Sequence, residues 1–387
     1  MDQTFIYSQS VSGRHFVGRR SDVNLLSNLL AQQENVALYG PPKCGKTSLL
    51  QQAFMQMKVA TIDFSTTEVP MMGVRTREDF VRRFGAAVLR VFAGTPGEFN
   101  DLAAAWLKGT HLVFDSREYA DKGEIISFNW DIDDDDVTAI LRLPYLLAAD
   151  RGVKLFILLK EWQCILEVPG HERILKRMEA VIKEQRSGLI PPQSSFIFSG
   201  SALNAMKYIF EQKRWFWRMC ERVSPTPLEE KEIIEHITRR LMTSGKVVEG
   251  DLLVGLCKLL RCDIWYINHF MAICDHMSKG YIMEPMMVDA LDCLTAIHEQ
   301  RFKAVMSDLT TFQLSLLKAI LDGHTRFSAA DVISGYGLNS SANVKRLKDA
   351  LIKKEIVTFD DKDEPVVIDP LFEYWARKFF FGEKLGL

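Results

Sequence analysis

The sequence lacks the long apolar runs, the leader and the paired cysteines that are typical of membrane and secreted proteins. No stretch of eighteen apolar residues occurs in the 387 residues, so we expect no membrane-spanning helix. The first five residues, Met1-Asp2-Gln3-Thr4-Phe5, show no basic segment followed by an apolar one, which predicts no signal peptide. The seven cysteines are scattered and odd in number, as expected of reduced thiols. Together these absences predict a cytoplasmic protein.

An excess of charge and a zinc motif are also missing. With 48 basic and 50 acidic residues the formal net charge is −2, so nucleic-acid binding would need a local basic patch. One region gathers four cysteines and two histidines: Cys257, Cys262, Cys274, Cys293, His269 and His276. Their spacing fits no zinc pattern, and their apolar helical surroundings favour core cysteines.

The stretch 40–47 has a pattern that indicates a specific ligand. It consists of Gly40, Pro41, Pro42, Lys43, Cys44, Gly45, Lys46 and Thr47, which match G-x-x-x-x-G-K-[ST] at every fixed position. Backbone N–H groups in such a loop form a concavity for anions, and the following helix points its positive end at the same place. Lys46 would reach the β- and γ-phosphates of ATP, and Thr47 would bind Mg²⁺. Together with Ser48, this stretch predicts a nucleotide-phosphate site; an ordinary glycine turn is the alternative.

The surrounding pattern predicts an α/β P-loop domain over residues 1–225, with a parallel sheet flanked by helices. The apolar run 36–39 reads as a buried strand directly before the loop, and helical spacing follows the loop. A second strand is expected at 59–64 and a helix at 78–92.

Two further segments interrupt this pattern. Short apolar runs predict a hairpin insertion at about 110–131. The acidic run 131–136 lacks the glycine and the terminal glutamate of a Ca²⁺ loop. It therefore favours the start of a helix, where acidic side chains are stabilised.

The element before the loop introduces a family resemblance. Phe16-Val17-Gly18-Arg19 precedes a helical stretch and then the phosphate loop. This order resembles the opening of the STAND and archaeal-type branch of AAA+ ATPases. The resemblance implies that Val17, Gly18 and Arg19 lie beside the adenine and ribose. A surface arginine in a short motif is the alternative interpretation.

The stretch 153–163 resembles the family's hydrophobic run followed by D-E-[FW]-Q. Glu161, Trp162 and Gln163 match, but Lys160 stands in place of the aspartate. That aspartate normally holds Mg²⁺, and a lysine would compete with the metal. The resemblance implies that Glu161 is the catalytic residue that activates water.

Three interpretations of this departure stay open. The site could hydrolyse ATP slowly, with Thr47 and water holding Mg²⁺. Lys160 could instead offset phosphate charge in a nucleotide-bound switch with little turnover. In the third interpretation, Lys160 and Glu161 form an exposed strand end.

The strand 194–201 resembles the family's sensor strand, which ends in a hydroxyl residue, glycine and serine near the γ-phosphate. Basic and aromatic residues follow it, and in related ATPases an arginine there faces the γ-phosphate of its own or a neighbouring subunit. The resemblance implies this catalytic role for Arg218 first and Arg222 second, because a guanidinium suits transition-state charge. Surface cations between packing aromatics are an equally good explanation.

The prolines Pro225 and Pro227 predict a domain boundary. Helical spacing over 226–309 resembles the helical lid of AAA+ proteins, although Cys262-Asp263-Ile264 replaces the family's G-x-P turn. Residues 310–387 predict a winged helix-turn-helix. Its segment 369–375 resembles the D-P-[LV]-F-x-x-W signature of archaeal-type ATPases.

The expected recognition helix, 340–354, carries Lys345, Arg346 and Lys348, which are candidates for contacts with duplex DNA. The acidic turn 360–364 would repel the DNA backbone, and winged helices also dock proteins, so both partners stay open.

These features predict an ATP/ADP-binding, STAND-like AAA+ protein with slow hydrolysis, whose nucleotide state positions its winged helix. Its partner would be a protein or duplex DNA, and no association with a membrane is expected. A homo-oligomer is one of the assembly states that the resemblance allows. The alternatives are a DNA-binding regulator and an inactive pseudo-ATPase scaffold that uses ATP structurally.

Overall fold

The computed structural model describes residues 4–188, 192–212, 214–360 and 362–385. The chain forms two compact units. The sheet unit comprises 21–42 and 49–225, and the helical unit comprises 1–20, 43–48 and 226–387. Among the described residues, no helix is both long and apolar enough to cross a bilayer.

A five-stranded parallel sheet forms the centre of the sheet unit. Its order is β2-β5-β6-β1-β7, and each neighbouring pair is parallel. The strands are β1 (Val36–Tyr39), β2 (Ser65–Pro70), β5 (Leu155–Lys160), β6 (Ser194–Gly200) and β7 (Glu221–Val223). Parallel strands are covered on both faces, and β1, β5 and β6 accordingly consist almost entirely of buried residues. The expected P-loop type of α/β fold is confirmed.

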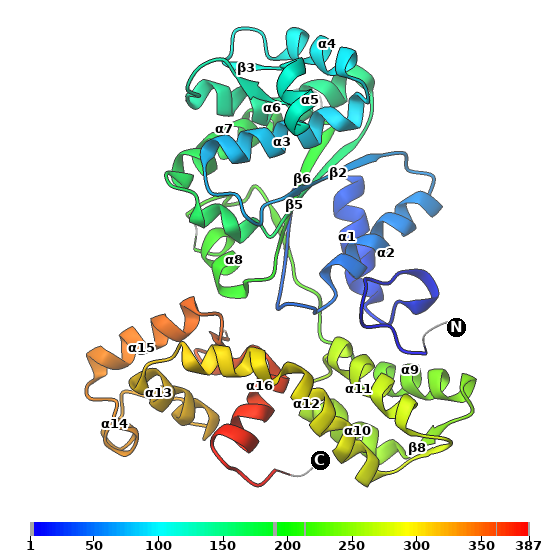
Figure 1. Ribbon diagram of the computed structural model, residues 1–387, viewed down its shortest axis with the longest axis vertical. Helices are drawn as coiled ribbons and strands as arrows, with labels where there is room; N and C mark the ends of the chain where they lie inside the picture. Colours follow the sequence, from blue (N-terminus) through cyan, green and yellow to red (C-terminus); the bar gives the residue numbers. More distant parts are fainter. Residues whose placement is uncertain (1–3, 189–191, 213, 361, 386–387) are drawn as a thin grey trace. The chain divides into compact units, whose positions relative to one another are not determined.

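Helices lie on both faces of this sheet (Figure 1). The helices of this unit are α1 (Arg20–Ala31), α2 (Lys46–Val59), α3 (Arg77–Phe92), α4 (Pro96–Trp106), α5 (Ser116–Lys122), α6 (Asp134–Arg151), α7 (His171–Arg186) and α8 (Leu203–Phe210). Of these, α4 and α5 lie near β3, apart from the five-stranded sheet. On one face Phe54 of α2 packs against Phe156 of β5, with 5.7 Å between ring centroids.

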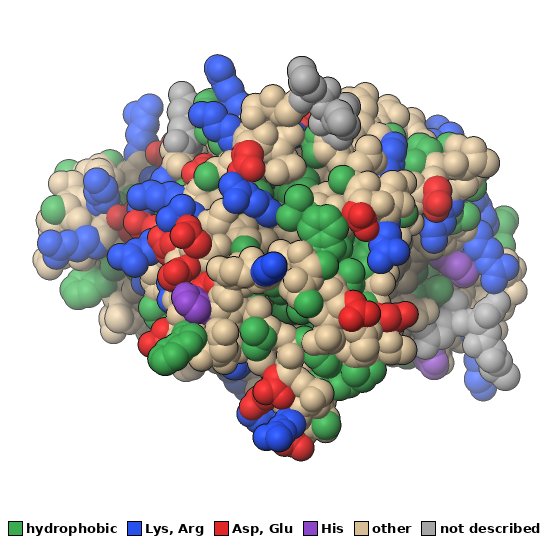
Figure 2. All heavy atoms as spheres, turned by 90° about the horizontal axis from the view of Figure 1, so that it is seen from above, with side chains coloured by type: hydrophobic (Ala, Val, Ile, Leu, Met, Phe, Trp, Pro, Cys, Tyr) green, Lys and Arg blue, Asp and Glu red, His purple; other side chains and the backbone are tan. Residues whose placement is uncertain are grey.

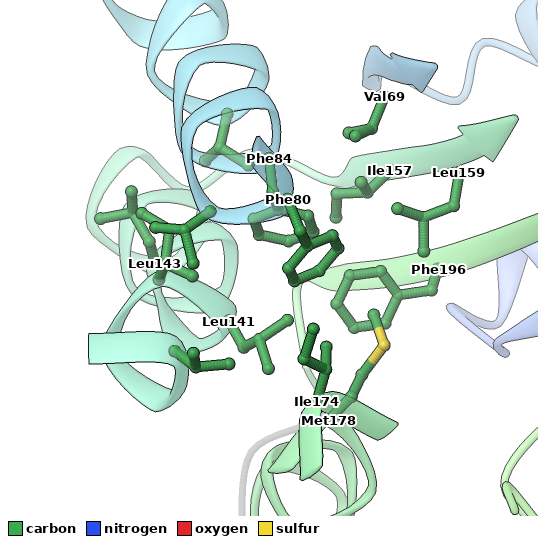
Figure 3. Close-up of a cluster of buried hydrophobic side chains, with 14 of the residues drawn as sticks. Val69, Phe80, Phe84, Leu141, Leu143, Ile157, Leu159, Ile174, Met178 and Phe196 are labelled. Atoms are coloured by element: carbon green, nitrogen blue, oxygen red, sulfur yellow. The ribbon is translucent and has the colours of Figure 1, made fainter. Parts of the chain in front are cut away.

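The opposite face of the sheet carries the main core of this unit. Side chains of α3, α6 and α7 meet alternate residues of β2, β5 and β6 there (Figure 3). The labelled contacts include Phe80 and Phe84 from α3, with Ile157 and Leu159 from β5, all fully buried. Because strand residues alternate between faces, Lys160 follows Phe156 and Leu158 onto the face that α2 covers.

One strand differs from the sequence prediction. Residues 59–64 are not a strand, since α2 continues to Val59 and β2 begins at Ser65. The actual strand lies at the sheet edge and alternates between exposed and more buried positions, with Glu68 exposed and Val69 buried. An edge strand needs no continuous apolar run, so its residues gave a weaker signal than the apolar segment before it.

The segment between α4 and α6 forms a small antiparallel pair, β3 (Leu112–Val113) with β4 (Ser127–Phe128). The helix α5 lies between the two strands in sequence, so the segment predicted as a hairpin insertion contains a helix. The acidic run begins α6, as expected: the Asp133 side chain caps the helix and Asp136 completes the capping box.

The helical unit begins its C-terminal part with α9 (Glu230–Thr243), α10 (Gly250–Leu259), α11 (Ile264–Met277) and α12 (Glu284–Ser307). This region is helical except for two short parallel strands, β8 (Val247–Val248) and β9 (Tyr281–Ile282).

The last part of the chain has the predicted winged-helix pattern. Its elements are α13 (Thr311–Leu321), α14 (Ala330–Tyr336), α15 (Ser341–Lys353), β10 (Val357–Phe359), β11 (Pro365–Val367) and α16 (Pro370–Trp375). Ser340 caps α15, because its hydroxyl accepts the Asn343 N–H at 3.2 Å. The strands β10 and β11 pair antiparallel and form the wing.

Candidate nucleotide-binding site

The phosphate loop leaves the sheet at the end of β1 and leads into α2, which begins at Lys46. Lys43 and Gly45 have φ values of 65° and 97°, which turn the backbone sharply. The φ of Gly45 is one that other residues rarely adopt, and a Cβ there would also displace the Arg19 guanidinium, whose Nη1 would lie 2.7 Å away. Lys46 is buried and its Nζ lies 3.8 Å from Sγ of Cys44. The loop therefore has the glycine turn, the lysine and the helix start that phosphate binding requires.

The Gly-Arg turn contacts this loop within the helical unit. The Arg19 guanidinium donates to the Cys44 carbonyl and to the Thr226 carbonyl, each at 2.7 Å. Gly18 has a φ of 57°, and a Cβ there would lie 2.3 Å from a carboxylate oxygen of Glu232. Val17 packs partly buried against the core of the same unit. The structure thus brings together two motifs that the sequence separates by more than twenty residues.

Two further contacts involve residues of the loop. The Ser48 hydroxyl accepts the Val11 N–H at 3.0 Å, while Thr47 is exposed. Burial raises the pKa of the Cys44 thiol, although the nearby positive charges of Lys46 and Arg19 lower it in part. Cys44 is therefore a protonated, partly buried side chain.

Glu161 lies at the carboxyl end of β5, in a left-handed backbone conformation with φ 55° and ψ 49°. This conformation is unusual for glutamate and is typical of functional sites. One carboxylate oxygen accepts the Ser201 hydroxyl at 2.5 Å, the Gln163 amide at 2.6 Å and the Ser201 N–H at 3.3 Å. Glu161 is thus held at the edge of the sheet where β6 also ends.

Lys160 forms an ion pair with the neighbouring strand. Its Nζ lies 2.5 Å from Oε2 of Glu68. The register pairs Pro70 with Lys160, so Glu68 lies two residues back on the same face. This pair directs the Lys160 ammonium toward the edge strand β2. The Glu68 carboxylate partly neutralises the positive charge of Lys160, which stands where the family pattern has an aspartate.

The two candidate arginines lie elsewhere in the sheet unit. Arg222 is on β7 beside Ala37, and Arg218 precedes that strand. Glu221 pairs with Val36, the first residue of β1, so Arg218 lies toward the amino edge of the sheet. The four residues of β1 span about 13 Å at 3.3 Å per residue. Within one chain, the structure does not bring Arg218 to the edge where Glu161 lies.

Comparisons with known proteins agree with this architecture. Residues 300–378 match a family model described as a probable winged helix domain. No curated protein matches the chain. A Walker-type ATPase of Pyrococcus abyssi is similar in structure, with a TM-score of 0.66 and 13% identity over 97% of this chain and 99% of that chain. The fold is that of a Walker-type ATPase.

The ORC2 protein of Aeropyrum pernix is also similar in structure. Its ADP form has a TM-score of 0.56 and 12% identity, over 94% of this chain and 93% of that chain. A second form of the same protein, with ADPNP and ADP, has a TM-score of 0.52 and 13% identity over 96% and 94% of the two chains. At these identities the likeness concerns the fold alone.

The basic candidates on α15 differ in their environments. Lys345 and Arg346 are exposed. Lys348 is partly buried: its Nζ lies 4.0 Å from the centroid of the Phe359 ring and 3.3 Å from Oδ2 of Asp363 in the wing. The wing therefore takes up one of the three cations predicted to face DNA; Asp361, in the same acidic turn, lies outside the described residues.

Basic and acidic side chains are interspersed on the face shown in Figure 2. This mixture agrees with the net charge of −2. Any electrostatic attraction of DNA would have to come from a local group such as Lys345 and Arg346.

The donor set does not fit a protein-built Mg²⁺ site. Thr47 offers a single hydroxyl. Lys160 stands at the position where the family pattern has the aspartate that normally completes the site. In the part of the chain that the structure describes, one group has metal-like spacing: ligand atoms of His111, Asp133 and Asp136 lie within 4.8 Å of one another. The Asp136 carboxylate already forms hydrogen bonds with the His111 ring, the His111 N–H and the Asp133 N–H, so this group joins the residue before β3 to the start of α6.

Sequence reasoning missed three contacting residues, Ser201 and Glu68 near the end of β5 and Trp265 beside the phosphate loop. Ser201 was placed on the sensor strand without its bond to Glu161, and Glu68 was not considered. Trp265, in the first turn of α11, has the Lys43 Nζ 5.6 Å from its ring centroid. Its only sequence signal was its position directly after the altered G-x-P turn.

Proposed function

We propose that the chain binds ATP or ADP at residues 40–48 and that the bound nucleotide sets the state of its winged-helix module. The observation that carries this proposal is the loop itself: a turn closed by Gly45, with Lys46 at the start of α2 and Arg19 bound to the Cys44 carbonyl. The structure of the ORC2 protein with ADPNP and ADP supports the choice of nucleotide.

The test compares two lysines of the same helix. Lys46→Ala removes the charge that would contact the phosphates, and charge-assisted hydrogen bonds of about 1.5–3 kcal/mol predict a loss of about tenfold or more in ATP affinity. Lys58→Ala, in the last turn of α2, is the matched control and should bind a fluorescent ATP analogue like the wild type. Equal affinity of the Lys46→Ala variant and the control would contradict nucleotide binding at this loop.

We further propose that hydrolysis is slow and uses Glu161 to orient water. When bound with the nucleotide, Mg²⁺ would supply charge neutralisation for the phosphates, with Thr47 as its one protein donor. Glu161→Gln keeps the size of the side chain and the contact with Ser201 but loses the base. Phosphate release should fall at least about a hundredfold, in line with general-base contributions. No turnover in the wild type, with ATP still bound, would support the pseudo-ATPase scaffold instead.

A second candidate function is DNA binding through α15, because Lys345 and Arg346 are exposed on the expected recognition helix. Duplex DNA should then bind more weakly as salt rises, and Lys345→Ala should reduce the steepness of that dependence by about one phosphate contact. Undetectable binding at low salt, with and without ATP, would eliminate this candidate and leave a protein partner.

The finer family assignment, a STAND-like AAA+ protein acting as a homo-oligomer, also belongs to this proposal. The position of Arg218 at the opposite sheet edge supports a role toward a neighbouring subunit. Light scattering should detect assembly with ATP, and Arg218→Ala should lower turnover in the assembly. A monomer at all concentrations, with turnover unaffected by the substitution, would refute this role.

A further inference from the structure

The first turn of α11 contacts the phosphate loop through Trp265. The Lys43 ammonium lies 5.6 Å from the Trp265 ring centroid, within the range of a cation–π interaction. The Trp265 Nε1–H donates to the Tyr7 carbonyl at 2.7 Å, which fixes the orientation of the indole. A change in the loop at Lys43 therefore changes a contact of this helix turn.

The next residue, Tyr266, contacts the beginning of α16 in the winged helix. Its buried hydroxyl lies 2.9 Å from Oδ2 of Asp369, and the Arg301 guanidinium donates to the same oxygen at 2.8 Å. The other oxygen of Asp369 accepts the N–H groups of Leu371 and Phe372, each at 3.0 Å. Asp369 thus joins α11 and α12 to the cap of α16, within the segment that resembles the family signature.

We propose that the first turn of α11 couples the phosphate loop to the winged helix, with Trp265 contacting the loop and Tyr266 acting on Asp369. The coupling rests on the proposed binding of nucleotide at the loop. Phosphates bound there attract the Lys43 ammonium more strongly than the face of an indole does, because a full negative charge exceeds a ring quadrupole. Lys43 then leaves Trp265, and the first turn of α11 loses one of its restraints.

The geometry of the helix explains how one turn serves two partners. Adjacent residues of an α-helix project about 100° apart, so Trp265 and Tyr266 point in different directions while sharing one rigid backbone segment. A shift of this segment moves the Tyr266 hydroxyl relative to Asp369 and alters the cap of α16. Coupling of this kind is reciprocal, so a ligand of the winged helix changes ATP affinity by the same factor. Trp265 and Tyr266 are positioning residues.

The test measures amide hydrogen exchange in residues 369–376 of the full chain, with and without ATP, alongside the affinity for a fluorescent ATP analogue. In the wild type, ATP changes exchange at the start of α16. Tyr266→Phe removes only the hydroxyl, so ATP affinity stays within about threefold while the ATP-dependent change in exchange falls by about threefold or more. Trp265→Leu removes the ring at the loop and gives the same loss.

Two controls make the test specific. The double variant, Trp265→Leu with Tyr266→Phe, should lose no more than either single variant, because both changes interrupt one route. Tyr281→Phe removes a hydroxyl from a side chain that is 77% exposed in the same unit, and it should keep the ATP-dependent change.

The outcomes separate this coupling from the proposed function. An unchanged ATP-dependent difference in Tyr266→Phe overturns the coupling even though ATP binds. An equal loss in Tyr281→Phe also overturns it, because the effect then comes from general loosening. No ATP binding by the wild type overturns the proposed function, and the coupling with it.

Discussion

The ion pair between Lys160 and Glu68 leads to a prediction about metal dependence. The two charged groups are 2.5 Å apart, with side chains 38% and 56% exposed. Ion pairs this exposed contribute only about 0.2–1 kcal/mol to stability. Substitutions at Lys160 should therefore leave the protein folded, and their effect on nucleotide binding can be measured directly.

The informative change is Lys160→Asp combined with Glu68→Gln. It replaces the cation by the carboxylate that the family pattern has at this position, and it removes the negative charge of Glu68, which would repel that carboxylate. Mg²⁺ bound with ATP should then gain a protein ligand. We expect Mg²⁺ to raise ATP affinity at least about tenfold in the double variant, equivalent to about 1.4 kcal/mol, and about threefold or less in the wild type.

The assay is a titration with a fluorescent ATP analogue in excess Mg²⁺ and again in chelator. Lys160→Gln with Glu68→Gln is the matched control, because it removes both charges without adding a ligand. The control should bind ATP with the weak metal dependence of the wild type. Equal metal dependence in all three proteins would refute the inference that Lys160 occupies the metal-binding position.

Two further predictions concern stability. Burial lowers the pKa values of His236 and His298 to about 4, so the unfolded chain binds protons that the folded chain does not. Their contribution to the free energy of unfolding is complete above about pH 6.5 and is lost as the pH falls toward 4. The melting temperature of the His298→Phe variant should therefore fall less steeply than that of the wild type over this pH range. Gly200→Ala should destabilise the protein by about 1–3 kcal/mol in denaturant titrations, because its Cβ would lie 2.4 Å from the sulfur of Met206. The control Gly97→Ala, with nothing within 4 Å, should not destabilise it; equal midpoints for the two alanine variants, or parallel pH profiles for the histidine variant, would contradict these arguments.

Features that depend on neighbouring residues could be predicted from the sequence. Asp133 and Ser340 cap helices at the two starts that the sequence predicts, in the acidic run 131–136 and at the recognition helix 340–354. The phosphate loop between a buried strand and a helix has the same local character. The winged helix over 310–387 was likewise predicted from local features, a recognition helix at 340–354 and an acidic turn at 360–364.

Features that depend on strand register could not be predicted in this way. Glu68 meets Lys160 only because β2 pairs with β5 and pairs Pro70 with Lys160. Arg218 was predicted to face the γ-phosphate because it follows the sensor strand in the sequence. The pairing of β7 with β1 places it toward the amino edge of the sheet. Pairing partners and register arise from packing across the whole sheet, and they leave little trace in the order of residues.

The altered turn before α11 departs from the family pattern, yet the helix that follows it contacts the phosphate loop. The sequence has Cys262-Asp263-Ile264 where the resemblance implies G-x-P. In the structure, Asp263 caps α11 and Trp265 contacts Lys43 of the phosphate loop. A cation–π contact responds to charge at the loop, whereas a proline turn would only fix the backbone. Under the proposed coupling, the replacement makes the first turn of α11 sensitive to bound phosphate, which is the property that the exchange experiment measures.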